Sequence, residues 1–216
     1  MKISLRHLRL PHLLAAVALA ISTLLSAPVF AAEKSPDEAK TFIQDLAQQA
    51  ITAVANRNLS DKERTENFRR LFVASFDIPQ ISQFVLGRYW KTATPDQQQD
   101  FVKQFQEFQV LNWTERFKSY KGENLAVTNA VKDDKGFTVD SQLNHPPAAP
   151  IPVQWKLKSG EDGKLQVTDI VVEGVSMAIT QRSDYNSMLQ GNGGKIDGLL
   201  NALRTKTDQM RANNGG

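Results

Sequence analysis

Hydrophobic side chains recur every three or four positions between residues 36 and 120, which is the spacing of amphipathic helices. Capping boxes predict where these helices begin, because each places a hydroxyl side chain three residues before a Glu or Gln that can bond back to it. The boxes are Ser35-Pro36-Asp37-Glu38, Ser60-Asp61-Lys62-Glu63 and Thr94-Pro95-Asp96-Gln97. Asp77-Ile78-Pro79 predicts a shorter helix that ends at Gly87.

The hydrophobic period changes to two after residue 124, which is typical of β-strands. The strands expected are Leu125–Val131, Phe137–Leu143, Val153–Lys158 and Leu165–Val172. The proline-rich segment His145–Pro152 must be a stiff connector or an edge, because proline has no backbone N–H to donate. Helical spacing returns at Met177–Leu189 and Ile196–Leu203, on either side of a glycine-rich linker. The pattern predicts an α+β fold: a four-stranded twisted antiparallel sheet packed with several N-terminal helices and two C-terminal ones.

The first 31 residues have the pattern of a secretory signal peptide. Basic residues precede an apolar run from Leu13 to Leu25, and small side chains follow it. That run of about 13 residues is shorter than the roughly 20 that a membrane-spanning helix needs, so we expect cleavage after Ala31 rather than an uncleaved anchor. A single domain is expected at 32–206, helical over 36–120, a sheet over 125–173 and helical again over 177–205, followed by a flexible polar tail at 207–216.

Removal of the leader changes the charge of the protein. The chain has a formal charge of +3, but Lys2, Arg6 and Arg9 belong to the leader, so the remainder is neutral. A neutral chain without a basic run has no electrostatic footprint for nucleic acid, nor for tight adsorption to anionic lipid. The absence of cysteine and the single remaining histidine, His145, exclude cysteine-based zinc sites and multi-histidine metal centres. We expect a soluble, exported protein without metal or cofactor.

Catalytic constellations are sparse. Asp140, Asp169 and Glu173 lie in or near strands and would have to meet in space to act as an acid–base pair. An enzyme with a cone-shaped α+β fold, using Asp140 or Asp169 as the base in an apolar cavity, is one alternative. A binding protein for apolar small molecules and a purely structural envelope protein are two others.

Phenylalanine is concentrated in the helical half. Ten Phe residues follow the predicted cleavage site, and nine of them lie between Phe42 and Phe117. A stripe of Phe at helical spacing forms either a filled core or the lining of an apolar pocket. Composition alone leaves both possibilities open.

Two motifs resemble the signature of the MlaC family of phospholipid-binding proteins linked to toluene tolerance. The first is Phe84-Val85-Leu86-Gly87-Arg88-Tyr89-Trp90-Lys91, followed by Thr94-Pro95-Asp96-Gln97-Gln98 and Phe101. The second is Asp169-Ile170-Val171-Val172-Glu173-Gly174-Val175-Ser176, followed by Arg182-Ser183-Asp184-Tyr185. Ile196-Asp197-Gly198-Leu199-Leu200 also fits, so the resemblance extends from about residue 36 to 206.

The resemblance implies a periplasmic carrier, not an enzyme, that shuttles phospholipid between inner- and outer-membrane complexes and so supports outer-membrane lipid asymmetry. Its partners would be phospholipid, an inner-membrane ABC transporter with an MCE-domain protein, and an outer-membrane lipoprotein complex. We expect it to act as a monomer. The acyl chains would lie in an apolar cavity between the sheet and the helices. The His145–Pro152 segment departs from the family by its length and proline content.

Apolar residues from both halves of the chain are the expected lining of that cavity. The candidates are Phe72, Phe76, Phe84, Phe101, Phe105, Phe108, Val139, Trp155, Leu157, Val171, Tyr185, Met188 and Leu189. We expect about half of them to be ordinary core. Arg88 and Lys91 are expected either to contact a headgroup or a partner, or to stabilise the end of the preceding helix.

Overall fold

The computed structural model describes residues 34–55, 58–160 and 162–214, so the predicted signal peptide and its cleavage site lie outside the described residues. The helices of the described chain are α1 (Pro36–Ala55), α2 (Asp61–Ser75), α3 (Ile78–Leu86), α4 (Pro95–Phe117), α5 (Met177–Gly191) and α6 (Ile196–Asn214), with a 3₁₀ helix at Gly87–Lys91. The strands are β1 (Asn124–Asp133), β2 (Gly136–Asn144), β3 (Ile151–Ser159), β4 (Leu165–Val172) and β5 (Val175–Ser176).

The predicted capping boxes begin their helices. Ser60 accepts a hydrogen bond from the backbone N–H of Glu63, whose carboxylate accepts one from the backbone N–H of Ser60. Thr94 and Gln97 make the same reciprocal pair at the start of α4. Each box satisfies N–H groups that the first turn of a helix leaves without partners.

The sheet is antiparallel with strand order β1-β2-β3-β4-β5, so it has one strand more than the sequence predicts. The extra strand is two residues long and pairs with the end of β4. Glu173 and Gly174 both have positive φ angles, 50° and 81°, and turn the chain between β4 and β5. A strand of two residues is too short to show a hydrophobic period, so the sequence pattern did not predict β5.

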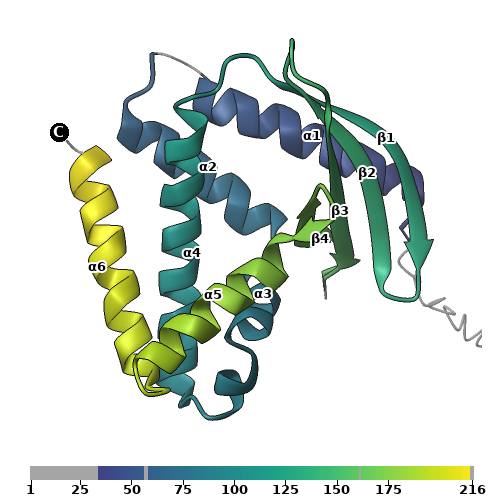
Figure 1. Cartoon of the computed structure of the whole chain (residues 1–216). Helices are drawn as coiled ribbons and strands as arrows, with labels where there is room; N and C mark the ends of the chain where they lie inside the picture. Colours follow the sequence, from purple (N-terminus) through teal and green to yellow (C-terminus); the bar gives the residue numbers. More distant parts are fainter. Residues whose placement is uncertain (1–33, 56–57, 161, 215–216) are drawn as a thin grey trace, which may run out of the picture. The chain divides into compact units, whose positions relative to one another are not determined.

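Helix α1 covers one face of the sheet (Figure 1). Ala39, Ile43 and Leu46 of α1 are buried against side chains of β2, β3 and β4. The register aligns Phe137 with Leu157 and Val139 with Trp155, so these four residues share the covered face. The opposite face carries Gln154, Lys156 and Lys158, as expected for a face that is not part of this core.

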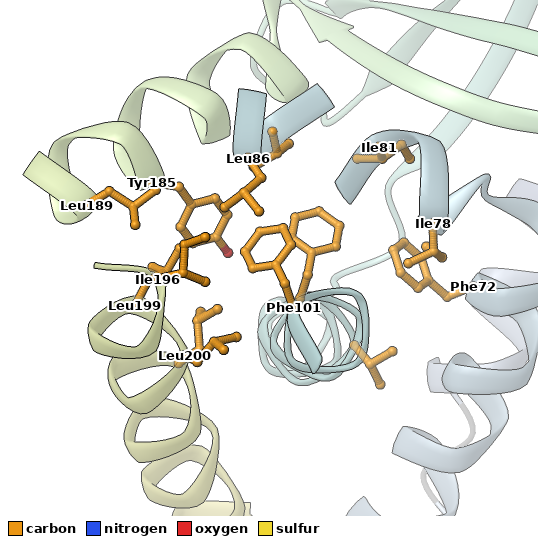
Figure 2. Close-up of a cluster of buried hydrophobic side chains, with 14 of the residues drawn as sticks. Phe72, Ile78, Ile81, Leu86, Phe101, Tyr185, Leu189, Ile196, Leu199 and Leu200 are labelled. Atoms are coloured by element: carbon orange, nitrogen blue, oxygen red, sulfur yellow. The ribbon is translucent and has the colours of Figure 1, made fainter. Parts of the chain in front are cut away.

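A second core lies among the helices. Phe101 and Phe105 of α4 are almost completely buried at its centre, between α2 and α3 on one side and α5 and α6 on the other. Figure 2 shows Phe101 facing Tyr185, with Leu199 and Leu200 of α6 nearby. The ring centroids of Phe101 and Tyr185 are 5.8 Å apart in an edge-to-face contact, a favourable arrangement for two aromatic rings.

The C-terminal helix is longer than predicted. Residues 207–214 form its last turns, although the polar sequence predicts a flexible tail there. Thr207 is 1% exposed and donates a hydrogen bond to the backbone oxygen of Arg204. Arg211 makes an ion pair with Glu107 of α4, so the polar residues of this segment pack against α4.

Replacing Gly136 with Ala should destabilise the fold much more than replacing Gly122. Both glycines have positive φ angles, 130° and 101°, and so share the backbone penalty of about 1–2 kcal/mol for an L side chain. A Cβ at Gly136 would lie 2.1 Å from the backbone oxygen of Leu157, whereas a Cβ at Gly122 would contact nothing within 4 Å. Urea unfolding should therefore show a loss of about 3 kcal/mol or more for Gly136→Ala and about half of that for Gly122→Ala. Equal losses would contradict the close approach of β3 to this turn.

Candidate functional site: a cavity and a groove beside strand β4

Two short segments cover the free edge of β4. The backbone N–H of Asp77 donates to the backbone oxygen of Val167 at 3.0 Å, and Phe76 pairs with Val167 as an isolated parallel bridge. Strand β5 pairs with Val171 and Val172 at the other end. Thr168, Asp169 and Ile170 lie between the two attachments.

A bulge at Thr168 changes which side chains of β4 share a face. Leu157 pairs with Val167, but its neighbour Lys156 pairs with Asp169. No residue of β3 therefore lies opposite Thr168 in the register. Ile170 therefore lies on the same face as Val167, three residues away. Val171, which a continuous period of two places with Val167, lies on the opposite face. Val171 is a lining candidate together with Val139, Trp155 and Leu157, but for this reason it does not share their face.

Asp169 connects β4 to the start of α5. Its carboxylate accepts a hydrogen bond from the hydroxyl of Ser176 at 2.5 Å and one from the backbone N–H of Ala178 at 2.9 Å. Ser176 is also the N-cap of α5 and accepts a bond from the backbone N–H of Ile179. A carboxylate at a helix N-terminus also interacts favourably with the helix dipole. The first turn of α5 is thereby fixed beside the open part of the β4 edge.

A small cavity, hereafter the inner cavity, lies at this open stretch. Its volume is about 50 Å³. The lining is mostly apolar and comes from α2, α3, α4, β4 and α5: Phe72, Phe76, Ile81, Phe105, Gln109, Trp113, Thr168, Asp169, Ile170, Met177, Ala178 and Gln181. Phe72 and Phe76 are in direct ring contact with centroids 4.5 Å apart, so side chains fill much of the space between α2 and β4.

A larger groove, hereafter the outer groove, adjoins the inner cavity. Its volume is about 680 Å³, within the range of about 300–1,000 Å³ that is usual for ligand sites. It lies between the face of the sheet opposite α1 and the helices α3 and α5. Ile81, Thr168, Asp169 and Ala178 line both spaces, so the cavity and the groove adjoin at these four residues.

The structure divides the thirteen apolar candidates between cavity and core. Phe72, Phe76 and Phe105 line the inner cavity, and Phe84 and Leu157 line the outer groove. The remaining candidates line neither space: Phe101, Phe108, Val139, Trp155, Val171, Tyr185, Met188 and Leu189. Of these, Phe101, Val139, Tyr185 and Leu189 are fully buried core, whereas Met188 is 37% exposed on α5.

Tyr185 carries a polar group into the helical core. Its side chain is 5% exposed, and its hydroxyl lies near the side chain of Gln109 but makes no hydrogen bond of ordinary geometry among the described residues. Burial raises the pKa of this phenol well above its ordinary value, and the nearby charge of Asp184 adds to the effect. The side chain therefore acts as a neutral aromatic in the core.

Arg88 and Lys91 are exposed on the 3₁₀ helix and line neither the cavity nor the groove. The guanidinium of Arg88 lies over the ring of Tyr89, 4.9 Å from its centroid, and donates to the Tyr89 hydroxyl. The basic residue that links α3 to α5 is instead Arg182, which lies 5.1 Å over the ring of Phe84. Its Nε would be 3.0 Å from a Cβ at Gly87, so the glycine gives this guanidinium its space.

Several residues that line the inner cavity were not predicted from the sequence. Trp113 lies eight residues after Phe105 on the same side of α4, with the buried amide of Gln109 between them. Because Gln109 interrupts the hydrophobic stripe, the sequence pattern did not indicate that Trp113 lines the cavity. Ile170 was missed because the bulge at Thr168 breaks the alternation, and Ala178 because a small side chain gives no hydrophobic signal.

The comparisons with known proteins agree with the resemblance seen in the sequence. The model of the MlaC protein family matches residues 44–205, which is more than half of the chain. The chain belongs to the MlaC family.

Two curated relatives cover most of the MlaC-family chain. It is 26% identical over 163 residues to the toluene tolerance protein ttg2D of Pseudomonas putida, covering 71% of this chain and 75% of the relative. It is 24% identical over 187 residues to the intermembrane phospholipid transport system binding protein MlaC of Haemophilus influenzae, covering 82% and 85%. A solved phospholipid-binding protein from Ralstonia solanacearum, in complex with a phospholipid, superposes with a TM-score of 0.68 at 20% identity, covering 80% of this chain and 98% of that one. The last comparison shows that the fold is shared.

The second MlaC-family motif has a clear structural role. Its Asp169 and Ser176 form the contact between β4 and α5, and its Glu173-Gly174 pair forms the turn before β5. The other candidate base, Asp140, accepts hydrogen bonds from Gln154 and more distantly from Asn129. The two carboxylates are therefore engaged in separate places.

The described part of the MlaC-family chain shows neither a cluster of metal-ligating residues nor a helix that could span a membrane. No group of three or more His, Asp or Glu residues there could hold a metal ion. Among the same residues, no helix is both long enough and apolar enough to cross a bilayer.

A polar groove of about 390 Å³ lies on the other side of α4. Glu107 is at its centre and pairs with Arg69 of α2 and with Arg211 of α6. Burial by itself raises the pKa of Glu107, but the two guanidinium groups outweigh it and hold the pKa below its ordinary value. The arrangement ties three helices together and explains why the polar end of α6 is ordered.

Asp169→Ala should lower the free energy of unfolding by about 2 kcal/mol, because it leaves the hydroxyl of Ser176 and the N–H of Ala178 without their acceptor. Asp140→Ala on the same face of the sheet is the matched control and should cost less than about 1 kcal/mol. Urea unfolding at neutral pH measures both. Equal costs would mean that the contact between Asp169 and α5 contributes nothing specific.

Glu107→Gln should change how stability depends on pH. Because the folded-state pKa of Glu107 is depressed, its contribution is complete at neutral pH and is lost as the pH falls below the ordinary value of 4.5 and through the folded-state value. The difference in unfolding free energy between wild type and Glu107→Gln should therefore shrink as the pH is lowered from 7. A difference that stays constant over this range would show that the pairs with Arg69 and Arg211 do not depress this pKa.

Proposed function

We propose that this chain is an exported phospholipid carrier and that the acyl chains of the bound lipid enter it at the inner cavity. The observation that carries the proposal is the apolar cavity at the open edge of β4, which adjoins a ligand-sized groove at four residues in a chain of the MlaC family. The names of the Haemophilus influenzae and Ralstonia solanacearum proteins support phospholipid as the ligand.

The rest of the proposal follows from the family and from the sequence. The leader, removed after Ala31, would direct the protein to the periplasm, where it would act as a monomer without metal or cofactor. It would receive and deliver lipid at an inner-membrane ABC transporter with an MCE-domain protein and at an outer-membrane lipoprotein complex. The exposed Arg88 and Lys91, which line neither the cavity nor the groove, suit contact with such a partner better than contact with bound lipid.

Ligand content gives the direct test. The full-length chain would be expressed in a Gram-negative host, purified from the periplasm without detergent, and weighed by native and then denaturing mass spectrometry. We expect an additional mass equal to that of a phospholipid in the native spectrum, absent after denaturation. A mass equal to the polypeptide alone, together with no uptake of lipid from vesicles, would contradict the proposal.

Ile170→Asp should abolish lipid retention, whereas Val171→Asp should preserve it. The two residues are adjacent and both half-buried, but only Ile170 lines the inner cavity, and a carboxylate there would have to be desolvated by an acyl chain. Circular dichroism and thermal unfolding would show that both variants fold, and the mass measurement would give lipid content. If instead only Val171→Asp lost its lipid, Val171 would line the lipid site and the inner cavity would be excluded as the entry point.

A further inference from the structure

The outer groove carries lysines that have no acidic partner. Lys135, Lys156 and Lys158 line it, and none of the three takes part in an ion pair among the described residues. Lys158 donates to the side-chain oxygen of Gln80 at 3.3 Å, across the groove from β3 to α3. These cations therefore face the groove with neutral hydrogen-bond partners at most.

Lys156 is the most confined of the three. It is half-buried and lies directly opposite Asp169 in the sheet, on the same face. The carboxylate of Asp169 is occupied by Ser176 and Ala178, so the ammonium of Lys156 donates instead to the hydroxyl of Thr138 at 2.9 Å. A half-buried ammonium whose hydrogen-bond partner is a neutral hydroxyl gains free energy when an anion approaches closely enough to accept a hydrogen bond from it.

Apolar surface lies next to these cations. Phe84 and Ile179 line the same groove and are 40% and 62% exposed. Ile81 and Ala178 then lead from the groove to the inner cavity. Cationic and apolar surfaces placed side by side match a ligand with an anionic head and hydrocarbon chains.

Two carboxylates also belong to the groove, and both are engaged. Asp133 accepts a hydrogen bond from the backbone N–H of Lys135 within the turn between β1 and β2. Asp169 is bound to the start of α5. Both carboxylates keep their negative charge, so three lysines and two aspartates leave the lining with a formal charge of +1, and the lysines are its hydrogen-bond donors of positive charge.

We propose that the outer groove is the headgroup site, in which Lys156 and Lys158 bind the phosphate of a phospholipid with Lys135 at the rim. The acyl chains then pass Ile81 and Ala178 toward the inner cavity. This inference rests on the proposed function, since it names the part of the ligand that stays outside the cavity. It also moves the expected headgroup contact from Arg88 and Lys91 to the sheet.

The test compares two lipids with the same acyl chains, phosphatidylglycerol and diacylglycerol, of which only the first carries a phosphate. Each is offered in phosphatidylcholine vesicles to the purified full chain, and bound lipid is counted by mass spectrometry. The wild type should bind more phosphatidylglycerol than diacylglycerol. In the double variant Lys156→Gln/Lys158→Gln the ratio of the two bound lipids should fall about tenfold, while diacylglycerol binding stays unchanged. Raising the salt concentration should reduce the wild-type preference in the same direction.

Two control proteins separate charge from fold. Lys121→Gln/Lys206→Gln makes the same change of net charge at exposed positions outside the groove and should keep the wild-type preference. Lys156→Arg/Lys158→Arg should keep it as well, because arginine also binds phosphate. If Lys156→Gln/Lys158→Gln keeps the full preference, the groove inference is overturned while the carrier function stands. If no variant and no wild type binds either lipid, the proposed function itself fails.

Free phosphate is the other source of the same chemistry. Titration of lipid-free protein with inorganic phosphate, followed by calorimetry, separates the two sources. No heat of binding, together with the lipid preference above, supports a headgroup site. Binding of inorganic phosphate that Lys156→Gln/Lys158→Gln abolishes, without any preference between the two lipids, would overturn the inference in favour of a free-phosphate site.

Discussion

The hydrogen bonds between Asp169 and the start of α5 hold the candidate site together. Asp169 can reach Ser176 and Ala178 only because β4 turns back through Glu173 and Gly174 and pairs with β5 for two residues. The same contact places Ala178 between the inner cavity and the outer groove. It also sets the direction of α5, which carries Tyr185 to the rings of Phe101 and Phe105. One carboxylate therefore positions the cavity, its boundary and a wall of the helical core.

Much of the fold could be predicted from local rules. Ser60, Thr94 and Asp77 begin helices because their side chains accept backbone N–H groups that would otherwise lack partners, and this depends only on residues nearby in sequence. The strands of the sheet alternate as expected except at two register shifts, one at Thr128 in β1 and one at Thr168 in β4. The bulge at Thr168 could not be predicted, because a register shift is decided by how β4 pairs with β3 and not by the side chains of β4 alone. This one cause explains why Val171 lies on the opposite face from the other strand candidates and why Ile170 was not predicted.

The site was harder to predict than the fold because a core and a cavity need the same residue types. Phe101 and Phe105 lie one helical turn apart and both are almost completely buried, yet only Phe105 lines the inner cavity. The difference comes from what lies opposite: Phe101 faces Tyr185 and α6, whereas Phe105 also reaches the open edge of β4. No pattern along α4 contains that information. Lys156 and Lys158, which we propose bind the headgroup, were not predicted for a related reason. On a strand, their pattern is that of ordinary solvent-facing charges.

Entry of acyl chains into the inner cavity, as proposed, would require protein atoms to move, because the cavity is small. About 50 Å³ is room for roughly two water molecules, far less than two acyl chains require. Two chains with about 30 carbons in total would lose about 24 kcal/mol on transfer to water, whereas leaving a cavity where a Phe side chain was costs only about 3–5 kcal/mol. Displacement of Phe72, Phe76 or Trp113 by a chain would therefore cost less than leaving the two chains in water. Such a rearrangement would involve Ile81 and Ala178, because these side chains of α3 and α5 line both the cavity and the groove.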